Sequence, residues 1–508
     1  MNNNMKKIIT AAIAVALFLN FSATKAQTIG SLNSTTDVGG PRLKGTTKYD
    51  KVKQVYTLTG SGKNIWANSD QFHFASVKMT GNFILTTNCQ FEGKGVVLHR
   101  KMGLMIRESL VPGSRYADAA VHGDGLLSLQ FRSAEGQVTG EIKASIRAPE
   151  VIQLERSGDT LIVRAANSGA SLVETGRVIQ KFKQPVYVGL FVCSHDSAVT
   201  ETARFHNFRI DVPAAVNLDG YRQPGASRLE LLNVATGERR VIYATKAHIE
   251  APNWSRDGKY LIYNSGGLLY KFPLSTGAPE QIPTGEVTRI NNDHGLSFDG
   301  KILAISSTNQ LSDGRSGSAV YTVPVSGGIP RLITKDVPSY WHGWSPDGQT
   351  LVFCAERKGD YDIWGIPSKG GNEFQLTSSP GLDDGPEFAP DGNHIYFNSV
   401  RSGMMKIWRM NPDGSQQQQV SFGPFHDWFA HLSPDGKSMV YVSFPTSVPA
   451  GSHPMNQRVV LQQQQTDSKE SKVLAYIYGG QGTMNVPSWS PDSKTIAFVS
   501  YTYGDPTY

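Results

Sequence analysis

The chain has 508 residues, of which 10% are aromatic and 18% are charged, with a formal net charge of +6. Lys6, Lys7 and Lys25 account for three of these charges, which leaves a net charge of +3 for the residues after position 26. This charge is too small to predict a nucleic-acid partner. Amphipathic helical patterns are missing after residue 26, while Gly, Pro, Ser and aromatic residues are abundant, which predicts an all-β fold.

Residues 1–26 have the pattern of a cleaved signal peptide. Lys6 and Lys7 precede the apolar run "IITAAIAVALFLNF", and Thr24 and Ala26 provide the small residues that a signal peptidase requires. No later segment approaches 18 consecutive apolar residues, so no transmembrane segment is expected after removal of the signal. We therefore expect a periplasmic or secreted protein.

The chain contains three cysteines, at positions 89, 193 and 354. Export would permit disulfide formation, and Cys89 with Cys193 is the one plausible pair because both lie in the N-terminal half. Buried free thiols are the alternative, since free cysteine is among the most buried residue types. The spacing is not that of a zinc site.

Residues 35–212 contain short alternating apolar runs separated by glycine turns, such as "FHFASVKMTGNFILTTNCQF" and "VYVGLFVCSHD", which predicts a β-sandwich. The stretches "MGLMIRESL", "RYADAAVHGDGLLSLQFR" and "QLERSGDTLIVR" resemble the concanavalin-like jelly-roll domains that accompany bacterial carbohydrate-active proteins. This resemblance implies glycan binding, and a spacer domain is the alternative. The candidate residues for a sugar site are Arg107, Tyr116, His122 and Arg132.

Residues 213–226 are rich in Pro, Gly and Asn and are expected to link the sandwich to a second β domain. That domain, at 227–508, contains six copies of a motif such as "GWSPDGQTLVFCA", which begins at Gly343. Each copy has a large apolar residue, an anchor residue, a tight turn and an alternating strand. Successive anchors are 42, 48, 44, 44 and 57 residues apart, and they are Ser255, Ser297, Ser345, Ala389, Ser433 and Ser490. A period in the forties predicts a β-propeller with one four-stranded blade per repeat.

The sixth repeat is short, because only "TYGDPTY" follows "TIAFVSY". The segment "SRLELLNVATGERRVIYA" at 227–244 has the pattern of the two outer strands of a blade. We therefore expect N-terminal strands to complete the last of six blades, which closes the ring and removes exposed sheet edges. The repeats resemble the WD40-like (PD40) repeats of the TolB family, which have a W-S-P-D-G-K-x-I-A-F pattern. A periplasmic member of that family binds the Pal lipoprotein, so the resemblance implies a protein ligand.

The first strand of each propeller blade lines the central channel and ends at the anchor turn. Residues that precede the anchor should therefore lie toward the opposite mouth of the channel, together with the links between second and third strands. The repeat does not require the polar and aromatic residues found there, although channels are commonly polar and wet. We predict that this set binds a glycan or a protein, and it comprises Asp293, Trp341, Asp384, Glu387, Asp427, Trp428, Gln481 and Asn485.

Four histidines are predicted near the same mouth, namely His294, His342, His431 and His453. Neutral imidazoles bind divalent ions such as Mn²⁺ or Zn²⁺, so these four histidines are the candidate ligands of a metal site. A histidine-rich mouth is similar to that of the oligogalacturonate lyases, which implies metal-dependent proton abstraction from an acidic sugar. In that alternative, His342 or His431 would act at the reaction centre and Arg357 or Arg401 would bind the uronate carboxylate. Ligand binding without catalysis remains the main hypothesis.

Overall fold

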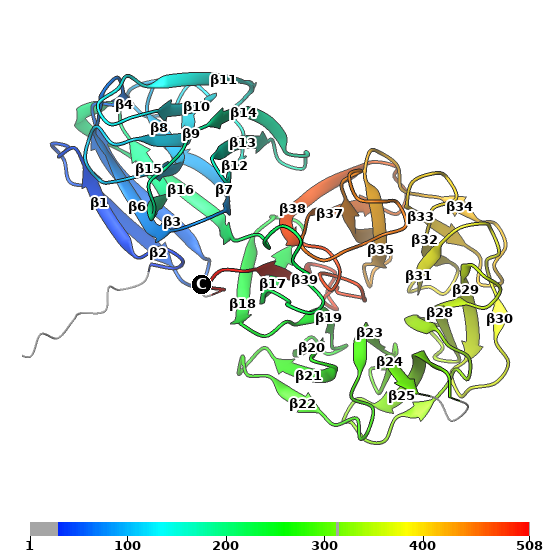
Figure 1. Ribbon diagram of the computed structural model, residues 1–508. Helices are drawn as coiled ribbons and strands as arrows, with labels where there is room; N and C mark the ends of the chain where they lie inside the picture. Colours follow the sequence, from blue (N-terminus) through cyan, green and yellow to red (C-terminus); the bar gives the residue numbers. More distant parts are fainter. Residues whose placement is uncertain (1–28, 311–313, 507–508) are drawn as a thin grey trace, which may run out of the picture.

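The computed structural model describes residues 29–310 and 314–506, and these residues form strands and turns without any helix. Figure 1 shows an N-terminal β-sandwich beside a ring-shaped β-propeller. The all-β prediction and the six-bladed propeller are thus confirmed. Among the described residues there is no helix with the length and apolar character needed to cross a membrane. The predicted signal peptide lies outside the described residues.

The sandwich consists of two antiparallel sheets of seven strands each. In spatial order, the first sheet contains β1 (Ser34–Val38), β6 (Phe72–Met79), β15 (Val186–Cys193), β8 (Lys101–Arg107), β9 (Tyr116–His122), β10 (Leu126–Arg132) and β11 (Gly140–Arg147). The second contains β14 (Val173–Ile179), β13 (Thr160–Ala166), β12 (Val151–Ser157), β7 (Phe83–Glu92), β16 (Asp196–Asp211), β3 (Val55–Gly62) and β2 (Thr46–Asp50). A short hairpin is formed by β4 (Ile65–Trp66) and β5 (Ser69–Asp70).

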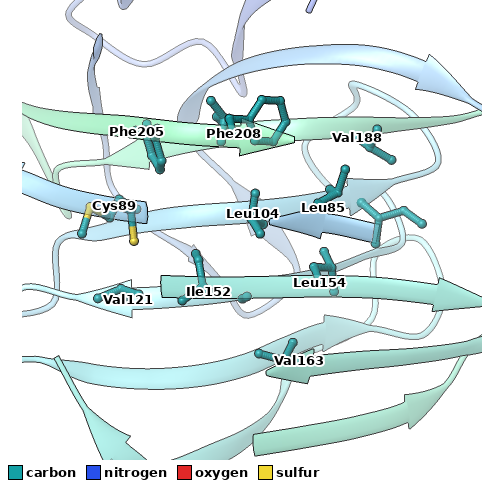
Figure 2. Packing of buried hydrophobic residues seen from close by; sticks show 14 of the residues in the cluster. Leu85, Cys89, Leu104, Val121, Ile152, Leu154, Val163, Val188, Phe205 and Phe208 are labelled. Carbon is teal, nitrogen blue, oxygen red and sulfur yellow. The ribbon is translucent and has the colours of Figure 1, made fainter. Parts of the chain in front are cut away.

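Alternating side chains of the two sheets form the sandwich core, as expected from the two-residue period of a strand (Figure 2). Cys89 lies in this core, whereas Cys193 belongs to a separate cluster that includes Ile65 of the β4–β5 hairpin. Both thiols are free, and burial raises the pKa of Cys89 to about 12 and that of Cys193 to about 11. Of the two alternatives, buried free thiols are therefore confirmed, and Cys89 and Cys193 do not pair because their side chains pack in different clusters.

Five blades of the propeller are four-stranded antiparallel sheets, each ordered from the inside outward. The first is β19 (Glu250–Trp254), β20 (Tyr260–Ser265), β21 (Leu268–Pro273) and β22 (Glu280–Ile282). The second is β23 (Ile290–Leu296), β24 (Ile302–Gln310), β25 (Ser316–Pro324) and β26 (Arg331–Leu332). The third is β27 (Ser339–Trp344), β28 (Thr350–Glu356), β29 (Tyr361–Pro367) and β30 (Phe374–Gln375). The fourth is β31 (Asp383–Phe388), β32 (Ile395–Ser399), β33 (Lys406–Met410) and β34 (Gln418–Gln419). The fifth is β35 (His426–Leu432), β36 (Ser438–Phe444), β37 (Gln457–Gln465) and β38 (Ser471–Gly479).

The sixth blade joins the two ends of the propeller. β39 (Thr495–Thr502) pairs with β17 (Ala226–Asn233), which pairs in turn with β18 (Arg239–Thr245). Its innermost position is held by a single bridge between Trp489 and Ile496. The predicted closure by N-terminal strands is confirmed, and it joins the first and last parts of the propeller through eight paired positions of β17 and β39.

The anchor turns show why the repeat sequence recurs. In the third blade the Ser345 hydroxyl donates to Asp347 Oδ1 at 2.6 Å and accepts the Thr350 amide at 2.9 Å. Gly348 has a φ of +69°, a conformation that favours glycine. The Ser-x-Asp-Gly spacing is therefore dictated by one hydrogen-bonded turn, and it holds the start of the second strand against the end of the first.

The sandwich and the propeller share a buried polar interface. Arg209 of β16 donates to Glu230 of β17 at 2.6 Å, and Arg239 of β18 donates to the same carboxylate at 2.8 Å. Arg228 donates to Asp211 at 2.6 Å. All of these side chains are at most 10% exposed. The two units are thus joined by paired buried charges as well as by the connecting chain.

Candidate functional site

A pocket of about 570 Å³ lies around the propeller channel, where the innermost strands begin. Among the described residues, its lining draws on all six blades and on the segment between sandwich and propeller, and it contains three carboxylates and no lysine or arginine. The lining comprises Tyr221, Glu250, Asn291, Asn292, Asp293, Tyr340, His342, Cys354, Tyr361, Leu382, Asp384, Phe429, Gly451, His453, Gln481 and Asn485.

Irregular pairing of the innermost strands directs these side chains into the channel. Each of β19, β23, β27, β31 and β35 has a register shift against its neighbour, close to the pocket residues. In β27, Trp341 and Gly343 occupy consecutive pairs with β28, so His342 is the extra residue. A β-bulge re-aims side chains and occurs often beside binding sites. The pocket is therefore a repeated feature of the innermost strands.

His342 lies between two carboxylates. Its Nε2 is 3.2 Å from Asp384 Oδ1 and 3.9 Å from Asp293 Oδ1. Burial alone would lower the pKa of His342, but the negative charges of Asp293 and Asp384 raise it above the usual value. The two acidic neighbours of His342 thus favour its protonated form.

The carboxylates respond differently to burial. Burial raises the pKa of Asp293 to about 7, and the charge of His342 only partly opposes this shift. For Asp384, burial also favours the neutral form, but the hydrogen bond and charge of His342 outweigh it and lower the pKa. Burial would raise the pKa of Glu250, but the interaction with His248, 3.4 Å away, and hydrogen bonds from Asn264 and Asn292 lower it. Two of the three acids are therefore ionised at neutral pH, and the third titrates there.

The opposite side of the pocket is formed by the loop between β36 and β37 and by the start of the sixth blade. His453 Nε2 is 4.0 Å from Asp384 Oδ2, and its Nδ1 is hydrogen-bonded to Gln481. Asn485 donates to the same Gln481 oxygen at 3.2 Å. Burial lowers the pKa of His453, which keeps this imidazole neutral. These groups can accept and donate hydrogen bonds to a ligand.

Aromatic rings complete the wall. The Phe429 ring stacks on His342 at 5.7 Å between centroids, and the Tyr340 and Tyr361 rings lie 6.5 Å apart. Tyr221 is 69% exposed and reaches the pocket from the connecting segment. The site therefore combines an acidic floor with aromatic sides, an arrangement suited to a polar ligand with a charged group.

The structure brings together six of the predicted site residues, namely Asp293, His342, Asp384, His453, Gln481 and Asn485. It places the two tryptophans elsewhere. Trp341 is 1% exposed and packs in a core cluster with Trp344 and Phe353, and Trp428 is fully buried. The prediction that the tryptophans are exposed at the mouth is therefore wrong. Strand alternation points Trp341 into the blade, whereas the bulge points His342 into the pocket. Trp428 supports the pocket from behind, since its ring lies 4.3 Å from that of His453.

Two of the four predicted histidines lie outside the pocket lining. His431 Nδ1 is hydrogen-bonded to Glu387 at 2.6 Å, and its Nε2 lies 3.1 Å from the Met484 carbonyl oxygen. His294 is fully buried, and burial lowers its pKa to about 4. His431, Glu387 and His294 therefore belong to the packed channel wall.

The remaining predicted residues have partners within the blades. Asp427 is buried and accepts hydrogen bonds from Lys406, Ser421 and Ser443. Arg357 pairs with Glu373 at 2.8 Å, and Arg401 pairs with Asp383 at 2.6 Å. Neither arginine lines the pocket, so neither presents a free guanidinium to an acidic ligand there.

Within residues 29–310 and 314–506, no group of three or more His, Cys, Asp or Glu side chains is arranged to hold a metal ion. The pairs His342–Asp384 and His431–Glu387 are instead close enough for direct hydrogen bonds. The four predicted histidines are divided between the pocket and the channel wall, so they do not form one ligand set for Mn²⁺ or Zn²⁺.

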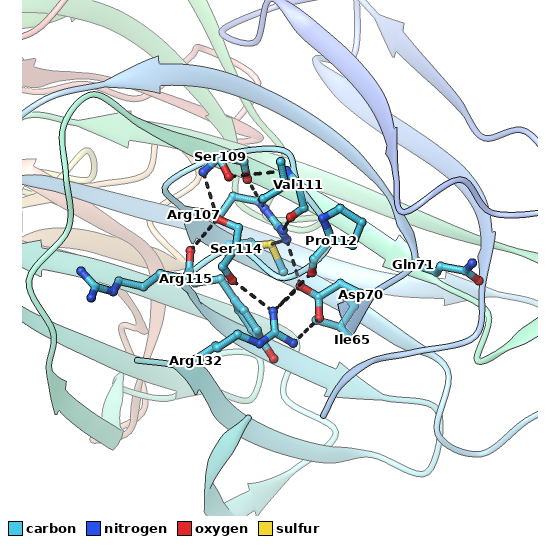
Figure 3. Close-up of polar contacts among 12 residues, drawn as sticks. Ile65, Asp70, Gln71, Arg107, Ser109, Val111, Pro112, Ser114, Arg115 and Arg132 are labelled. Carbon is cyan, nitrogen blue, oxygen red and sulfur yellow. Dashed lines mark hydrogen bonds and ion pairs between the residues drawn. The ribbon is translucent and has the colours of Figure 1, made fainter. Parts of the chain in front are cut away.

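In the sandwich, the predicted sugar-binding arginines form an internal cluster (Figure 3). Arg132 makes two hydrogen bonds of 2.7 Å with the carboxylate of Asp70, and Arg107 lies 3.4 Å from the same group. Arg107 also donates to the carbonyls of Ser109 and Val111. All three charged side chains are fully buried. The prediction of a sugar site at Arg107 and Arg132 is therefore wrong, and these residues form a structural cluster that holds the β4–β5 hairpin in place.

The other two sandwich candidates are also buried. The Tyr116 hydroxyl is 3.1 Å from Thr139 Oγ1, and His122 is 5% exposed. Burial lowers the pKa of His122 to about 4. These side chains are therefore enclosed by the fold and do not face solvent, where a glycan would bind.

Sequence reasoning missed several pocket residues although a signal was present. The residue five positions before the anchor lines the pocket in five of the six blades, and these residues are Glu250, Asn292, Tyr340, Asp384 and Asn485. Of these five, only Asp384 and Asn485 are among the predicted site residues, since a common register is a weaker chemical signal than a histidine. Tyr221 lies in the connecting segment, outside the repeats, so no fixed distance from an anchor residue indicates it.

Comparison with known proteins identifies the propeller. The family described as the TolB beta propeller domain matches residues 338–476. An uncharacterized protein of Agrobacterium fabrum, Atu1656, is 45% identical over 276 residues, which cover 54% of this chain and 92% of that protein. A solved structure from Agrobacterium tumefaciens, called a "putative TolB", has 45% identity and a TM-score of 0.52, and the match covers 55% of this chain and 98% of that one.

More distant matches are shorter or weaker. The Tol-Pal system protein TolB of Francisella tularensis is 30% identical over 132 residues, which cover 24% of this chain and 28% of that protein. An oligogalacturonate lyase from Vibrio parahaemolyticus aligns at 15% identity with a TM-score of 0.35, covering 53% of this chain and 77% of that one, and this likeness does not bear on function. On the strength of the Agrobacterium match and the repeat family, the chain belongs to the family of TolB-like β-propeller proteins.

Proposed function

We propose that this protein is an exported binding protein whose propeller pocket holds a segment of a protein partner. The observation that carries the proposal is the pocket of about 570 Å³, in which side chains from six blades converge although the repeat does not require them. Pockets with a few convergent polar groups and perturbed pKa values are the usual binding sites of a fold. The charged signal-like segment at residues 1–26 supports export to the periplasm.

A protein partner is favoured over a glycan or a uronate substrate. Among its relatives, the Francisella protein is named as part of a Tol-Pal system, which indicates an assembly of proteins. Arg357 and Arg401 are paired inside the blades, and the buried cluster of Arg107 and Arg132 leaves no sugar site at those residues. The sandwich then acts as a rigid support that is fixed to the propeller by Glu230 and its two arginines.

Site-specific photo-crosslinking tests this proposal. A photoreactive amino acid replaces Tyr221, which is 69% exposed at the pocket, and in a control protein it replaces Ile329, which is 90% exposed and outside the lining. We expect a discrete protein adduct from position 221 in intact cells and none of the same mass from position 329. The adduct should weaken when Asp384→Ala is added to a protein that remains folded. Equal adducts at both positions, or an adduct that is insensitive to Asp384, would contradict the proposal.

A further inference from the structure

The pocket has a charge character that the proposed function does not by itself specify. Its three carboxylates, on Glu250, Asp293 and Asp384, face one histidine that lies between two of them, and the described lining has no lysine or arginine. Glu250 is 3.4 Å from His248, which is outside the lining. The interior of the pocket is therefore acidic at neutral pH.

Asp293 is the least compensated of the three. It is 5% exposed, and its one ion-pair partner within 4 Å among the described residues is His342, at 3.9 Å. Asp384 takes the closer position to that imidazole, at 3.2 Å, and also accepts the amide of Gly385 at 2.7 Å. A buried carboxylate without a close cation is unfavourable, so a cation that enters the pocket would relieve this cost.

Aromatic rings supply a second and independent attraction. Tyr340, Tyr361, Tyr221 and Phe429 line the same cavity. A positive group within about 6 Å of an aromatic face is attracted by the electron-rich ring, and this attraction grows as the group is desolvated. Burial raises the pKa of Tyr340 to about 12, so this ring stays neutral and keeps its electron-rich face at physiological pH.

From these features we infer that the pocket is a receptor for a positively charged amino or guanidinium group, bound between the carboxylates of Asp293, Asp384 and Glu250 and the tyrosine rings. This inference deepens the proposed function and rests on it, because the group would belong to the captured ligand. A protonated primary amine offers three donors and a guanidinium five, which matches a floor composed of acceptors. Two sources share this chemistry, namely a basic side chain or amino terminus of a polypeptide, and a free small amine.

The size of the cavity suits this class of group. A volume of about 570 Å³ is large enough for a lysine or arginine side chain with part of the adjoining backbone, and it falls within the range of ordinary ligand pockets. The amide side chains of Asn292 and Asn485 line the same space and can bond to a peptide backbone. An anionic ligand would instead meet uncompensated negative charge at the floor.

Calorimetric titration of the full chain tests the inference with matched probes. The peptides acetyl-Gly-Lys-Gly-amide, acetyl-Gly-Gln-Gly-amide and acetyl-Gly-Glu-Gly-amide differ only in the central side chain, and cadaverine serves as the free amine. We expect the lysine peptide, cadaverine or both to bind at least tenfold more tightly than the glutamine peptide, with the glutamate peptide weakest. If the lysine peptide and cadaverine bind with similar affinity, the natural ligand is assigned to the free amines. If only the lysine peptide binds, the ligand is assigned to a polypeptide.

The variants locate the effect. Asp384→Asn should weaken binding of the cationic probe by about tenfold, and Asp293→Asn provides a second variant if the first does not fold. Asp347→Asn is the matched control, because Asp347 lies in the anchor turn at the other end of β27 and should leave affinity unchanged.

Two results overturn the inference. One is equal binding of the lysine and glutamine peptides, and the other is the absence of binding by every cationic probe. A protein adduct at position 221 together with either result would leave the proposed function standing and remove only the cationic ligand class. If that adduct is not formed but cadaverine still binds, the proposed protein partner is removed and the cationic ligand class stands.

Discussion

The buried Asp70–Arg107–Arg132 cluster of the sandwich and the acidic pocket of the propeller both contain buried charged residues, but these residues are fully paired in the first and incompletely paired in the second. In the sandwich, Asp70 meets Arg132 through two bonds of 2.7 Å, and the three charged side chains are fully buried. In the propeller, His342 Nε2 is as far as 3.9 Å from Asp293 Oδ1, and a cavity of about 570 Å³ adjoins both side chains. The sequence predicts site residues in both regions.

The difference shows how a structural cluster is separated from a binding site. Charged groups with complete hydrogen bonding and no adjoining volume stabilise the local fold, since any loss leaves a buried charge unpaired. Groups with incomplete pairing beside an open cavity keep part of their bonding capacity for a ligand. The comparison therefore predicts opposite consequences for stability when one carboxylate is neutralised in each region.

The largest effect is expected at Asp70. Asp70→Ala would leave the guanidinium groups of Arg107 and Arg132 buried without their carboxylate, and we expect a loss of about 3–5 kcal/mol of stability. Urea unfolding followed by tryptophan fluorescence measures the change. Glu174→Gln is the control, because its pair with Arg177 is exposed and should contribute less than about 0.5 kcal/mol. Similar midpoints for the two variants would show that the sandwich cluster is not structural.

Neutralising Asp293 is expected to stabilise the protein, in contrast to Asp70, and the gain in stability depends on pH. Its pKa rises from 3.8 in the unfolded chain to about 7 in the pocket, because burial disfavours the charged form. Such an acid stabilises the fold below its unfolded pKa, and that contribution is lost as the pH rises through about 7. Because this loss begins above the unfolded pKa of 3.8, Asp293→Asn should gain stability relative to the parent protein as the pH rises from 5 to 7, and it should be the more stable of the two at pH 8.

The expected gain at pH 8 is about 1–2 kcal/mol. Three pKa units correspond to roughly 4 kcal/mol as an upper bound, and loss of the attraction to His342 offsets part of it. Thermal unfolding at pH 5, 6, 7 and 8 measures the difference. Asp299→Asn is the control, since hydrogen bonds from Ser297 and the Lys301 amide lower the pKa of Asp299, so its effect should stay constant over this range. A parent protein that is more stable than Asp293→Asn at pH 8 would contradict the assigned shift.

The propeller could be predicted from sequence because each blade repeats the same local chemistry. The Ser345–Asp347–Gly348 turn fixes its own geometry through short-range hydrogen bonds, so the spacing alone reveals blade number and closure. The direction of His342, in contrast, depends on a bulge that forms between β27 and β28. Side-chain identity does not encode such a register shift.

The same limit explains the errors in the site. His294 and His342 both lie three residues before an anchor, yet β23 has two extra residues relative to β24 whereas β27 has one relative to β28. One imidazole is therefore buried in the wall and the other faces the cavity. For Arg107 and Arg132, the decisive partner Asp70 is distant in sequence, and no local pattern indicates that pairing.

The smallest expected effects come from one tyrosine in each region. Tyr116→Phe removes a buried hydroxyl that lies 3.1 Å from Thr139 Oγ1, so we expect a loss of about 1 kcal/mol. Tyr340 lines the open pocket, and Tyr340→Phe should change stability by less than about 0.5 kcal/mol. Urea midpoints of the two variants, measured side by side, give the difference directly. If Tyr340→Phe were the more destabilising change, its hydroxyl would be part of a completed internal network, and the pocket would resemble the sandwich cluster more than a binding site.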